Sequence, residues 1–344
     1  MPNAVVARAP VRGFDAGGWT DTWFSGHGAV CHLALAPGAE VLARVLGHTD
    51  GASADVTMRV AAYGDHYRFD PDRAPGRHPL LEAVIRRWAP RGSCLEIHVS
   101  SPVPAGSSLG TSAAVTVSLL TAMRGLADDP AISGPTWAAE VARLAHEVET
   151  NDLGRQSGVQ DQVAAAFGGA NLVEVSPYPE FQVEHLSLPP KTVELLNNRC
   201  FTVYLGAMHD SSSVHSTVIA GLEADRHRAE DLLAPLREAA LRAAQALAAA
   251  DLGAYGDAMS SCTRSQAQLH PSLVNPLAHE IIARAERFGA AGCKVNGAGG
   301  PGGTVSIVGP EDPEPLKAAL RELAGVSTLD LTPCPNGAHL ADAS

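Results

Sequence analysis

The chain of 344 residues has few lysines, few aromatic side chains and no long apolar run. Lysine occurs only at positions 191, 294 and 317, and aromatic residues make up 5% of the sequence. A mechanism that needs a lysine therefore has few candidates. No run reaches the roughly 18 apolar residues of a membrane-spanning helix, and the first residues lack the apolar segment of a secretion signal. We therefore expect a cytoplasmic protein.

Cysteine clusters and an excess of basic residues are also missing. The six cysteines are scattered, with no CxxC pair and no zinc-finger spacing, which favours reduced thiols that serve packing. There are 25 basic residues against 37 acidic ones, a net charge of −12. Nucleic acids and anionic membranes are therefore not expected as partners, because both attract basic surfaces. A small anionic ligand stays possible, since a local pocket can oppose the overall charge.

The length and the composition, 45% hydrophobic and 18% charged, indicate a globular protein of two domains or one large domain. Hydrophobic periodicity predicts both kinds of element, so the class is α+β. The best boundary is the polar stretch 176–191. Strands are expected at 32–46, 56–63, 94–100, 167–175, 201–207, 304–308 and 327–331. Helices are expected at 78–88, 110–126, 136–149, 213–250 with a break or kink at Pro235, 252–269, 272–288 and 314–323.

The first of three glycine-bearing segments lies between an expected strand and an expected helix. It reads Pro104-Ala-Gly-Ser-Ser-Leu-Gly-Thr-Ser-Ala-Ala114. Its glycines allow backbone N–H groups to turn toward one point, and the start of the helix adds unpaired donors, a combination that binds phosphate. Thr111 and Ser112 offer hydroxyl ligands for Mg²⁺. The plainer alternative is that one of them only caps a core helix.

The same segment also contains G-x-S-x-G around Ser108, the nucleophile motif of α/β-hydrolases. Asp210 and either His270 or His279 would then complete a catalytic triad. Two prolines separate the preceding strand from Ser108, whereas that motif needs the serine at the corner between strand and helix. The match is therefore weak.

The second segment, 297–303, formally contains G-x-G-x-x-G. A dinucleotide site requires a helix to begin there, but a strand is expected at 304–308, and Pro301 lies inside the loop. The segment is therefore either a loop that lets the backbone approach a ligand closely or an ordinary tight turn. The third segment, 8–21, combines Arg12, several glycines and Asp21. Taken singly, such residues are more often surface residues than catalytic ones.

Together, in this order and at these separations, the three segments resemble the motifs of the GHMP kinase superfamily, which includes galactokinase, homoserine kinase and mevalonate kinase. The first family motif is matched by Ala-Pro-Val-Arg at 9–12 and Thr-Asp at 20–21, the second by 104–114 and the third by 297–303. Three positions depart from the usual pattern. Ser108 and Pro301 stand where glycine is usual, and Thr111 replaces a serine but keeps a hydroxyl.

A fourth segment, 149–162, is similar to the galactokinase-type stretch in which a glutamate precedes Gly-x-x-Asp-Gln. By this resemblance Glu149 is a Mg²⁺ ligand and Asp161 the catalytic aspartate. The sequences at 16–22 and 157–171 look like the branch of heptose 7-phosphate kinase and fucokinase. Relatives in that branch phosphorylate the anomeric hydroxyl of a sugar.

The resemblance implies a two-domain fold, with an N-terminal domain like ribosomal protein S5 at 1–185 and a ferredoxin-like C-terminal domain at 186–344. It implies ATP and Mg²⁺ as cofactors and a sugar or sugar phosphate as the small-molecule substrate of a monomer or homodimer. Asp161 would orient or deprotonate the attacking hydroxyl, and Arg12 would keep Asp161 ionised and offset charge on the phosphoryl group.

The other site residues follow from the same resemblance. Mg²⁺ would be held by Ser112 and Glu149. The expected ATP-binding residues are Pro104, Gly106, Ser107, Ser108, Leu109, Gly110, Thr111 and Ser112. The expected acceptor-binding residues are Trp19, Thr20, Asp21, Gly158, Gly299 and Gly300. Two alternatives remain at this point: a serine hydrolase that uses Ser108, and a non-catalytic sensor of sugar and ATP.

Overall fold

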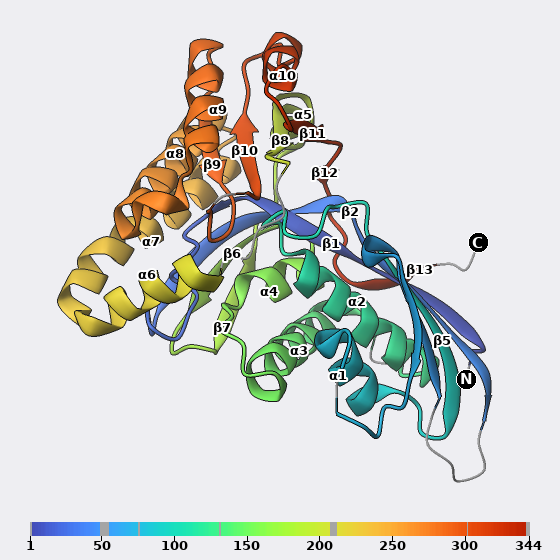
Figure 1. Ribbon diagram of the computed structural model, residues 1–344. Helices are drawn as coiled ribbons and strands as arrows, with labels where there is room; N and C mark the ends of the chain where they lie inside the picture. Colours follow the sequence, from blue (N-terminus) through green and yellow to red (C-terminus); the bar gives the residue numbers. More distant parts are fainter. Residues whose placement is uncertain are drawn as a thin grey trace.

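The computed structural model describes residues 2–48, 55–74, 76–130, 132–206, 212–300 and 302–341. Over these ranges the chain folds into two β-sheets with helices packed against them (Figure 1). The α+β class expected from the sequence is confirmed. Asp210 and Pro301, named in the sequence analysis, lie outside the described residues.

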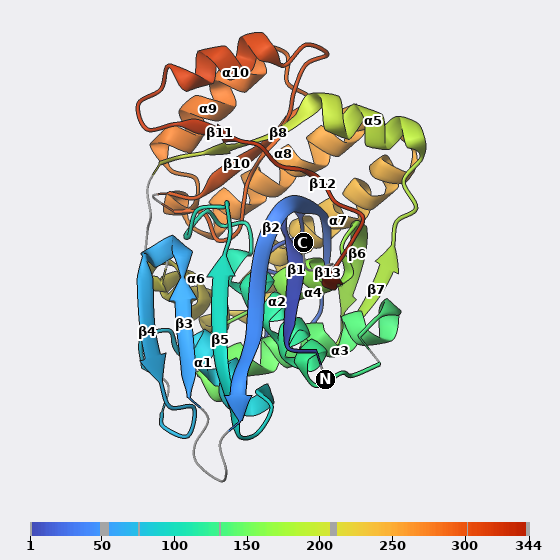
Figure 2. The same ribbon diagram turned by 90° about the vertical axis from the view of Figure 1, so that its right-hand side faces the viewer.

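The larger sheet has the order β13-β1-β2-β5-β3-β4, and β6, β7 and β12 attach to it through β2 (Figure 2). Strand β2 is 21 residues long, which lets it pair with β1 from Ala4 to Ala16 while β5 and β6 pair with its two ends. The strands are β1 (Ala4–Ala16), β2 (Gly28–His48), β3 (Val56–Val60), β4 (Asp65–Phe69), β5 (Ser93–Ser100), β6 (Ala170–Val175), β7 (Phe181–His185), β12 (Thr332–Pro333) and β13 (His339–Ala341).

The smaller sheet is antiparallel throughout, with the order β11-β8-β10-β9. Its strands are β8 (Cys200–Tyr204), β9 (Gly292–Val295), β10 (Thr304–Val308) and β11 (Ser327–Leu329). The glycine segment 297–303 connects the adjacent strands β9 and β10. It is therefore a loop between two strands, as the sequence predicts.

Helices α1 (Pro79–Trp88), α2 (Thr111–Leu126), α3 (Gly134–Glu147) and α4 (Gln160–Phe167) lie together on one side of the larger sheet (Figure 1). Helix α2 is buried almost all round because it is built of small and aliphatic residues, which lets it pack closely against β1 and β2. The remaining helices are α5 (Pro190–Arg199), α6 (Ser212–Ala224), α7 (Arg226–Ala248), α8 (Leu252–Leu269), α9 (Pro276–Arg287) and α10 (Glu314–Arg321). Three short turns, η1 (Ala61–Tyr63), η2 (Val148–Asp152) and η3 (Pro271–Leu273), complete the set.

Packing crosses the expected domain boundary at residue 185. Leu236 and Leu247 of α7 belong to the same hydrophobic core as β1 and β2, and the late strands β12 and β13 pair with β2 and β1. The smaller sheet keeps a core of its own around Phe201, Ile281 and Ile307. Residues 186–344 therefore build the second sheet and also complete the first, and the division at 185 stays a prediction.

Several element boundaries differ from those expected. Strands β1 and β7 were not predicted, and β7 lies inside the stretch taken as a boundary. The long helix expected at 213–250 breaks at Asp225, whose carboxylate accepts the N–H of Arg228 and so begins α7, while Pro235 lies inside that helix. Among the described residues no helix combines the length and apolar character needed to cross a membrane.

Candidate active site

The loop between β5 and α2 has a backbone that bends sharply three times. Gly106 and Gly110 have φ angles of +75° and +72°, and Ser108 has +60°, all in the left-handed region. This explains why glycine is usual at position 108. Helix α2 begins directly after Gly110 with no side-chain cap. The first N–H groups of the helix therefore end at this loop, which is the arrangement that binds anions.

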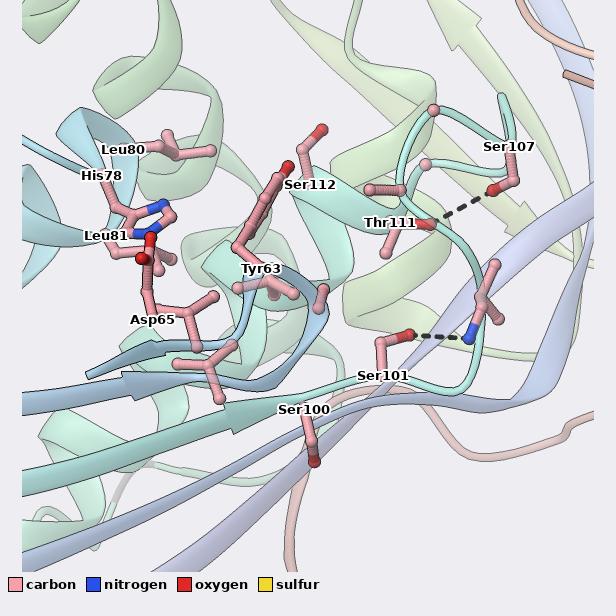
Figure 3. Close-up of a pocket in the computed structure, with 18 of the residues that line it drawn as sticks. Tyr63, Asp65, His78, Leu80, Leu81, Ser100, Ser101, Ser107, Thr111 and Ser112 are labelled. Carbon is pink, nitrogen blue, oxygen red and sulfur yellow. Dashed lines mark hydrogen bonds and ion pairs between the residues drawn. The ribbon is translucent and has the colours of Figure 1, made fainter. Parts of the chain in front are cut away.

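A first cavity of about 690 Å³ extends from this loop to the β3–β4 hairpin. Figure 3 shows Ser107 and Thr111 on one side and Asp65 and His78 on the other, with Tyr63 and Ser112 between them. Ring atom Nε2 of His78 lies 2.7 Å from Oδ2 of Asp65. The cavity thus has a backbone-rich end at the loop and an end with aromatic and polar side chains at the hairpin.

The hairpin end is held by the buried carboxylate of Glu82. It accepts the backbone N–H groups of Arg77 and His78, each at 3.0 Å, and the Tyr67 hydroxyl at 2.8 Å. A carboxylate that receives several donors fixes the segment that carries them. Glu82 therefore holds His78 at the cavity without lining it.

A second, smaller cavity of about 100 Å³ shares Asp161 with the first, so this residue lines both cavities. Four separate parts of the chain form it: β1 with the segment that follows it, the segment 157–161, helix α6 and the loop after β9. Its lining residues are Arg12, Gly18, Trp19, Asp21, Thr22, Ser157, Gly158, Gln160, Asp161, His215, Gly297 and Ala298.

Asp161 and Arg12 form an ion pair where the cavities meet. Nε of Arg12 donates to Oδ1 of Asp161 over 2.7 Å, and Nη1 donates to Oδ1 of Asp15 over 3.1 Å. Burial lowers the pKa of the Arg12 guanidinium, but Asp161 and Asp15 more than reverse this and raise it above its ordinary value. Arg12 therefore stays charged. Gly110 lies against the same carboxylate, since a Cβ there would be 3.1 Å from Cγ of Asp161.

Asp21 is buried beside this pair. Its Oδ2 accepts the backbone N–H of Gln160 over 2.9 Å. Burial raises the pKa of the Asp21 carboxyl to about 6, and the charge of Asp161 adds to this, against the N–H of Gln160. A Cβ at position 158 would stand 2.1 Å from Oδ2 of Asp21, so only glycine fits there. Asp21 is thus a carboxylate whose pKa lies well above its ordinary value.

Two residues of the second cavity carry buried polar atoms without a hydrogen-bond partner among the described residues. These atoms are Nε1 of Trp19 and Oε1 of Gln160, and both residues are 6% exposed. The Trp19 ring lies 4.8 Å from the ring of His215, between centroids. A buried donor or acceptor without a partner is unfavourable, and a ligand with hydroxyl groups would satisfy both.

Glu149 lies on the π-helical turn η2 and lines neither cavity. Its Oε2 accepts the Ser157 hydroxyl over 2.8 Å and the Gln162 amide over 2.6 Å, and burial raises its pKa. Ser112 is exposed and lines the first cavity. In the part of the chain that the structure describes, no group of three or more His, Cys, Asp or Glu residues forms a metal site. A hydroxyl and a carboxylate still suit Mg²⁺, which prefers oxygen ligands and takes few from protein.

Some residues expected to contact a ligand have clear structural roles in the fold. Thr20 is fully buried, and its hydroxyl donates to the Gly17 carbonyl over 2.7 Å, so it fixes the turn that carries Trp19 and Asp21. Pro104 and Leu109 line neither cavity, although the Leu109 carbonyl accepts the N–H of Arg12 over 2.9 Å.

Gly299 and Gly300 were also expected to bind the acceptor. Neither lines the second cavity, where Gly297 and Ala298 stand instead. The N–H of Gly300 donates to the Leu273 carbonyl over 3.2 Å, and a Cβ on Gly299 would be 1.9 Å from the same oxygen. These glycines let the loop pack tightly against Leu273.

The geometry does not form the triad of a serine hydrolase. Strand β5 ends at Ser100, well before Ser108, and among the described residues no hydrogen bond joins Ser108 to a histidine. His270 is 2.7 Å from the Ser272 hydroxyl at the start of η3, and His279 is exposed on α9.

Sequence motifs missed several residues of both cavities: Tyr63, Asp65 and His78 in the first, and Gln160, His215 and Ala298 in the second. Gln160 lies next to Asp161 in a quoted motif, and Ala298 lies in the glycine segment 297–303, so both could have been selected. The others occur in segments without a motif, and only the fold brings them to the site.

Residues 79–169 match the family model of the GHMP kinases N terminal domain. The chain is 27% identical over 246 residues to D-glycero-alpha-D-manno-heptose 7-phosphate kinase of Campylobacter jejuni, covering 72% of this chain and 70% of that protein. It is also 27% identical over 254 residues to a mevalonate kinase of Archaeoglobus fulgidus, covering 71% and 79%.

The fold is similar over the whole chain to solved structures. One is a D-glycero-D-manno-heptose 1-phosphate kinase from Bacteroides thetaiotaomicron, with a TM-score of 0.75, 22% identity and 99% of each chain covered. The matched N-terminal domain, the two kinase relatives and this likeness in fold agree with the order of the four motifs. The chain therefore contains a GHMP kinases N terminal domain and is similar to kinases, which are phosphotransferases with an alcohol group as acceptor.

Proposed function

We propose that this kinase transfers the γ-phosphoryl group of ATP to a sugar hydroxyl, with ATP in the first cavity and the sugar in the second. The observation that carries the proposal is that Asp161, paired with Arg12, lines both cavities. A nucleotide and an acceptor that fill them would meet at this carboxylate. The first cavity, about 690 Å³, also has the size of a typical cofactor site.

The loop 104–112 would receive the phosphate groups. Its bent backbone and the uncapped start of α2 offer N–H donors and the positive end of the helix dipole. The nucleoside would then extend toward Tyr63 and His78. We therefore expect the two parts of the chain to have different roles. Residues 1–185 bind the nucleotide and carry Asp161, and residues 186–344 close the acceptor side with His215 and Gly297.

The chemical step needs alignment and charge neutralisation more than covalent help. The sugar oxygen forms a bond to the γ-phosphorus, the bond from that phosphorus to the β–γ bridging oxygen breaks, and ADP leaves. The proton of the hydroxyl passes to Asp161. Arg12 uses Nε and Nη1 for its two carboxylates, so Nη2 remains to offset charge on the phosphoryl group.

Ser112 and Glu149 would hold Mg²⁺ near the phosphate groups. When bound, the ion supplies charge neutralisation across the ATP phosphates. Both side-chain bonds given above for Glu149 go to Oε2, which leaves Oε1 outside them.

The acceptor is best described as a sugar with an anomeric hydroxyl, either a heptose 7-phosphate or a hexose. The second cavity offers two carboxylates, an indole N–H, an amide oxygen and hydroxyl groups, which suit a polyhydroxylated ligand. Relatives named as heptose phosphate kinases support the same class. An anomeric hydroxyl is more acidic than an ordinary alcohol, so a carboxylate is a sufficient base.

A coupled assay of ADP release tests this proposal. Free hexoses, heptose 7-phosphate, uronic acids and mevalonate are offered in turn with ATP and Mg²⁺, and ³¹P NMR identifies the phosphorylated position. We expect turnover with a sugar and an anomeric phosphate as product. Turnover with mevalonate alone would overturn the substrate class. Binding of sugar and ATP without any turnover would favour a non-catalytic sensor.

A further inference from the structure

Arg12 of the reacting pair continues into two buried charges that the proposed chemistry does not use, Asp15 and Lys294. Arg12, Asp15 and Lys294 are 3%, 0% and 1% exposed. Arg12 binds Asp15 through Nη1, and Nζ of Lys294 lies 3.8 Å from the other carboxylate oxygen, Oδ2 of Asp15. With Asp161, the set contains two cations and two anions, so its charge is balanced.

Lys294 also reaches the glycine loop. Its Nζ donates to Oε1 of Gln266 over 2.8 Å and to the backbone carbonyl of Val295, and Nε2 of Gln266 donates to the Gly297 carbonyl over 3.1 Å. Gly297 and Arg12 both line the second cavity. One lysine of the smaller sheet is therefore connected to two parts of the cavity, one on each sheet.

The electrostatics of Asp15 depend on this lysine. Burial alone would raise the pKa of the Asp15 carboxyl, but Lys294 first and Arg12 second hold it below its usual range. Without Lys294, Asp15 would be a buried anion with Arg12 as its remaining ion-pair partner. It would then compete with Asp161 for the same guanidinium.

We propose that Lys294, acting through Asp15, is a positioning residue for phosphoryl transfer, which keeps the Arg12 guanidinium bound to Asp161. This rests on the proposed function for its effect on turnover, but not for the placement of Arg12. A buried ion pair contributes little to stability compared with apolar packing, so its value here lies in geometry. A shift of about 1 Å in a group that aligns reactants is enough to slow a reaction on the order of 100-fold.

The test compares Lys294→Met with the double variant Asp15→Asn/Lys294→Met. The double variant removes the buried charge of Asp15 but keeps an oxygen to accept Nη1 of Arg12. Lys317→Met is the matched control, because Lys317 also pairs with a carboxylate, Glu314, but lies on α10, with no contact to these buried charges. Lys294→Gln keeps a hydrogen-bond donor and removes only the charge, and replaces Lys294→Met if that protein does not fold.

Two quantities are measured on folded protein. One is kcat and KM for ATP by ADP release. The other is the hydrogen-exchange rate of Arg12 Nε–H by NMR of arginine-labelled protein, which needs no turnover. We expect Lys294→Met to lower kcat about 30-fold or more with little change in KM, and to speed exchange at Arg12 about tenfold. The double variant should recover both in part, and Lys317→Met should match the parent.

Three results would overturn the proposal: a kcat close to that of the parent, a lower kcat without faster exchange at Arg12, or no recovery in the double variant. If the parent itself turns over no acceptor, the proposed function fails, and the exchange rates alone decide. Faster exchange with recovery then supports the placement of Arg12 by Lys294, and unchanged exchange refutes it.

Discussion

The two cavities that meet at Asp161 are built in different ways. The first takes its loop end from one continuous stretch, 105–115, in which glycines, serines and backbone form most of the surface. The second is formed by side chains from four distant segments. A site made of backbone and small residues can be recognised in the sequence as a motif. A site made of side chains from distant segments can be recognised only once the fold is known.

The cavities also differ in buried charge. Arg12 and Asp21 of the second cavity are almost fully buried, with Asp15 and Lys294 behind them. The charged residues of the first, such as Asp65 and Arg77, are partly exposed. Electrostatic effects are stronger where water is excluded. Substitutions in the second cavity, or against Asp161, should therefore change chemistry or acceptor binding, and those elsewhere in the first cavity should change nucleotide binding.

The largest effect is expected for Asp161→Asn. Loss of the base should lower kcat about 1,000-fold, because general bases contribute between 10²- and 10⁴-fold. Binding of an ATP analogue, measured by calorimetry, should stay nearly the same. The control is Asp152→Asn, an aspartate on η2 that pairs with Arg87. Full activity in Asp161→Asn would show that another group accepts the proton.

Gly110→Ala tests the contact between the loop and Asp161. The new Cβ would stand 3.1 Å from Cγ of Asp161 at a φ of +72°, so we expect kcat to fall on the order of 10- to 100-fold. Gly134→Ala has the same strain, at +75°, with open space around the Cβ. Both variants should lose similar stability on thermal unfolding, but only Gly110→Ala should lose activity. Equal loss of activity would mean that strain, not displacement of Asp161, is the cause.

Glu149→Gln should raise the Mg²⁺ concentration for half-maximal ADP release about tenfold or more. The amide oxygen still accepts from Ser157 and Gln162, and removal of a buried charge should leave the melting temperature equal or higher. An unchanged Mg²⁺ requirement would contradict the assignment of Glu149 as a ligand.

Asp21→Asn should weaken acceptor binding and remove a pH dependence of stability. Folding raises the pKa of Asp21 from 3.8 to about 6, so the native state binds this proton more tightly than the unfolded chain does. The free energy of unfolding therefore falls as pH rises through that window. The variant should gain a few degrees in melting temperature over the parent between pH 4 and pH 7.5, worth about 1–2 kcal/mol.

The acceptor KM of Asp21→Asn should rise about tenfold at pH 7.5, as expected for loss of a charged hydrogen-bond acceptor. Asp257→Asn, an exposed aspartate on α8, is the control for both measurements. A melting difference that does not change with pH would show that the Asp21 carboxyl does not titrate in this window.

The smallest effect is expected for Ser108→Gly. Glycine adopts the φ of +60° without strain, so we expect a gain of about 0.5–1 kcal/mol in the free energy of unfolding. ADP release should be nearly unchanged. Loss of all activity would instead support a nucleophilic role for Ser108.

The sequence predicts the parts of the site that stand in motifs. Arg12, Asp21, Asp161 and the loop 104–112 lie together, as the order of the segments suggests. Thr20 and Gly299, whose acceptor contacts stay a prediction, support turns in the fold, because a motif selects residues that shape a loop as well as residues that touch a ligand.

Other features depend on contacts between distant segments. Lys294 precedes the glycine loop and has no distinguishing pattern, and its partner Asp15 is 279 positions away in a strand that was not predicted. Strand β13 has only three residues, too few for a periodic signal, and exists because β1 offers it a free edge. Neither pairing is visible in local sequence.

A crystal structure with Mg²⁺, a non-hydrolysable ATP analogue and the acceptor found by the ADP-release assay tests the central claim most directly. We expect the terminal phosphate between Gly110 and Arg12, with the acceptor hydroxyl within hydrogen-bond distance of Asp161. A nucleotide bound outside the first cavity, or an acceptor separated from Asp161, would contradict the account.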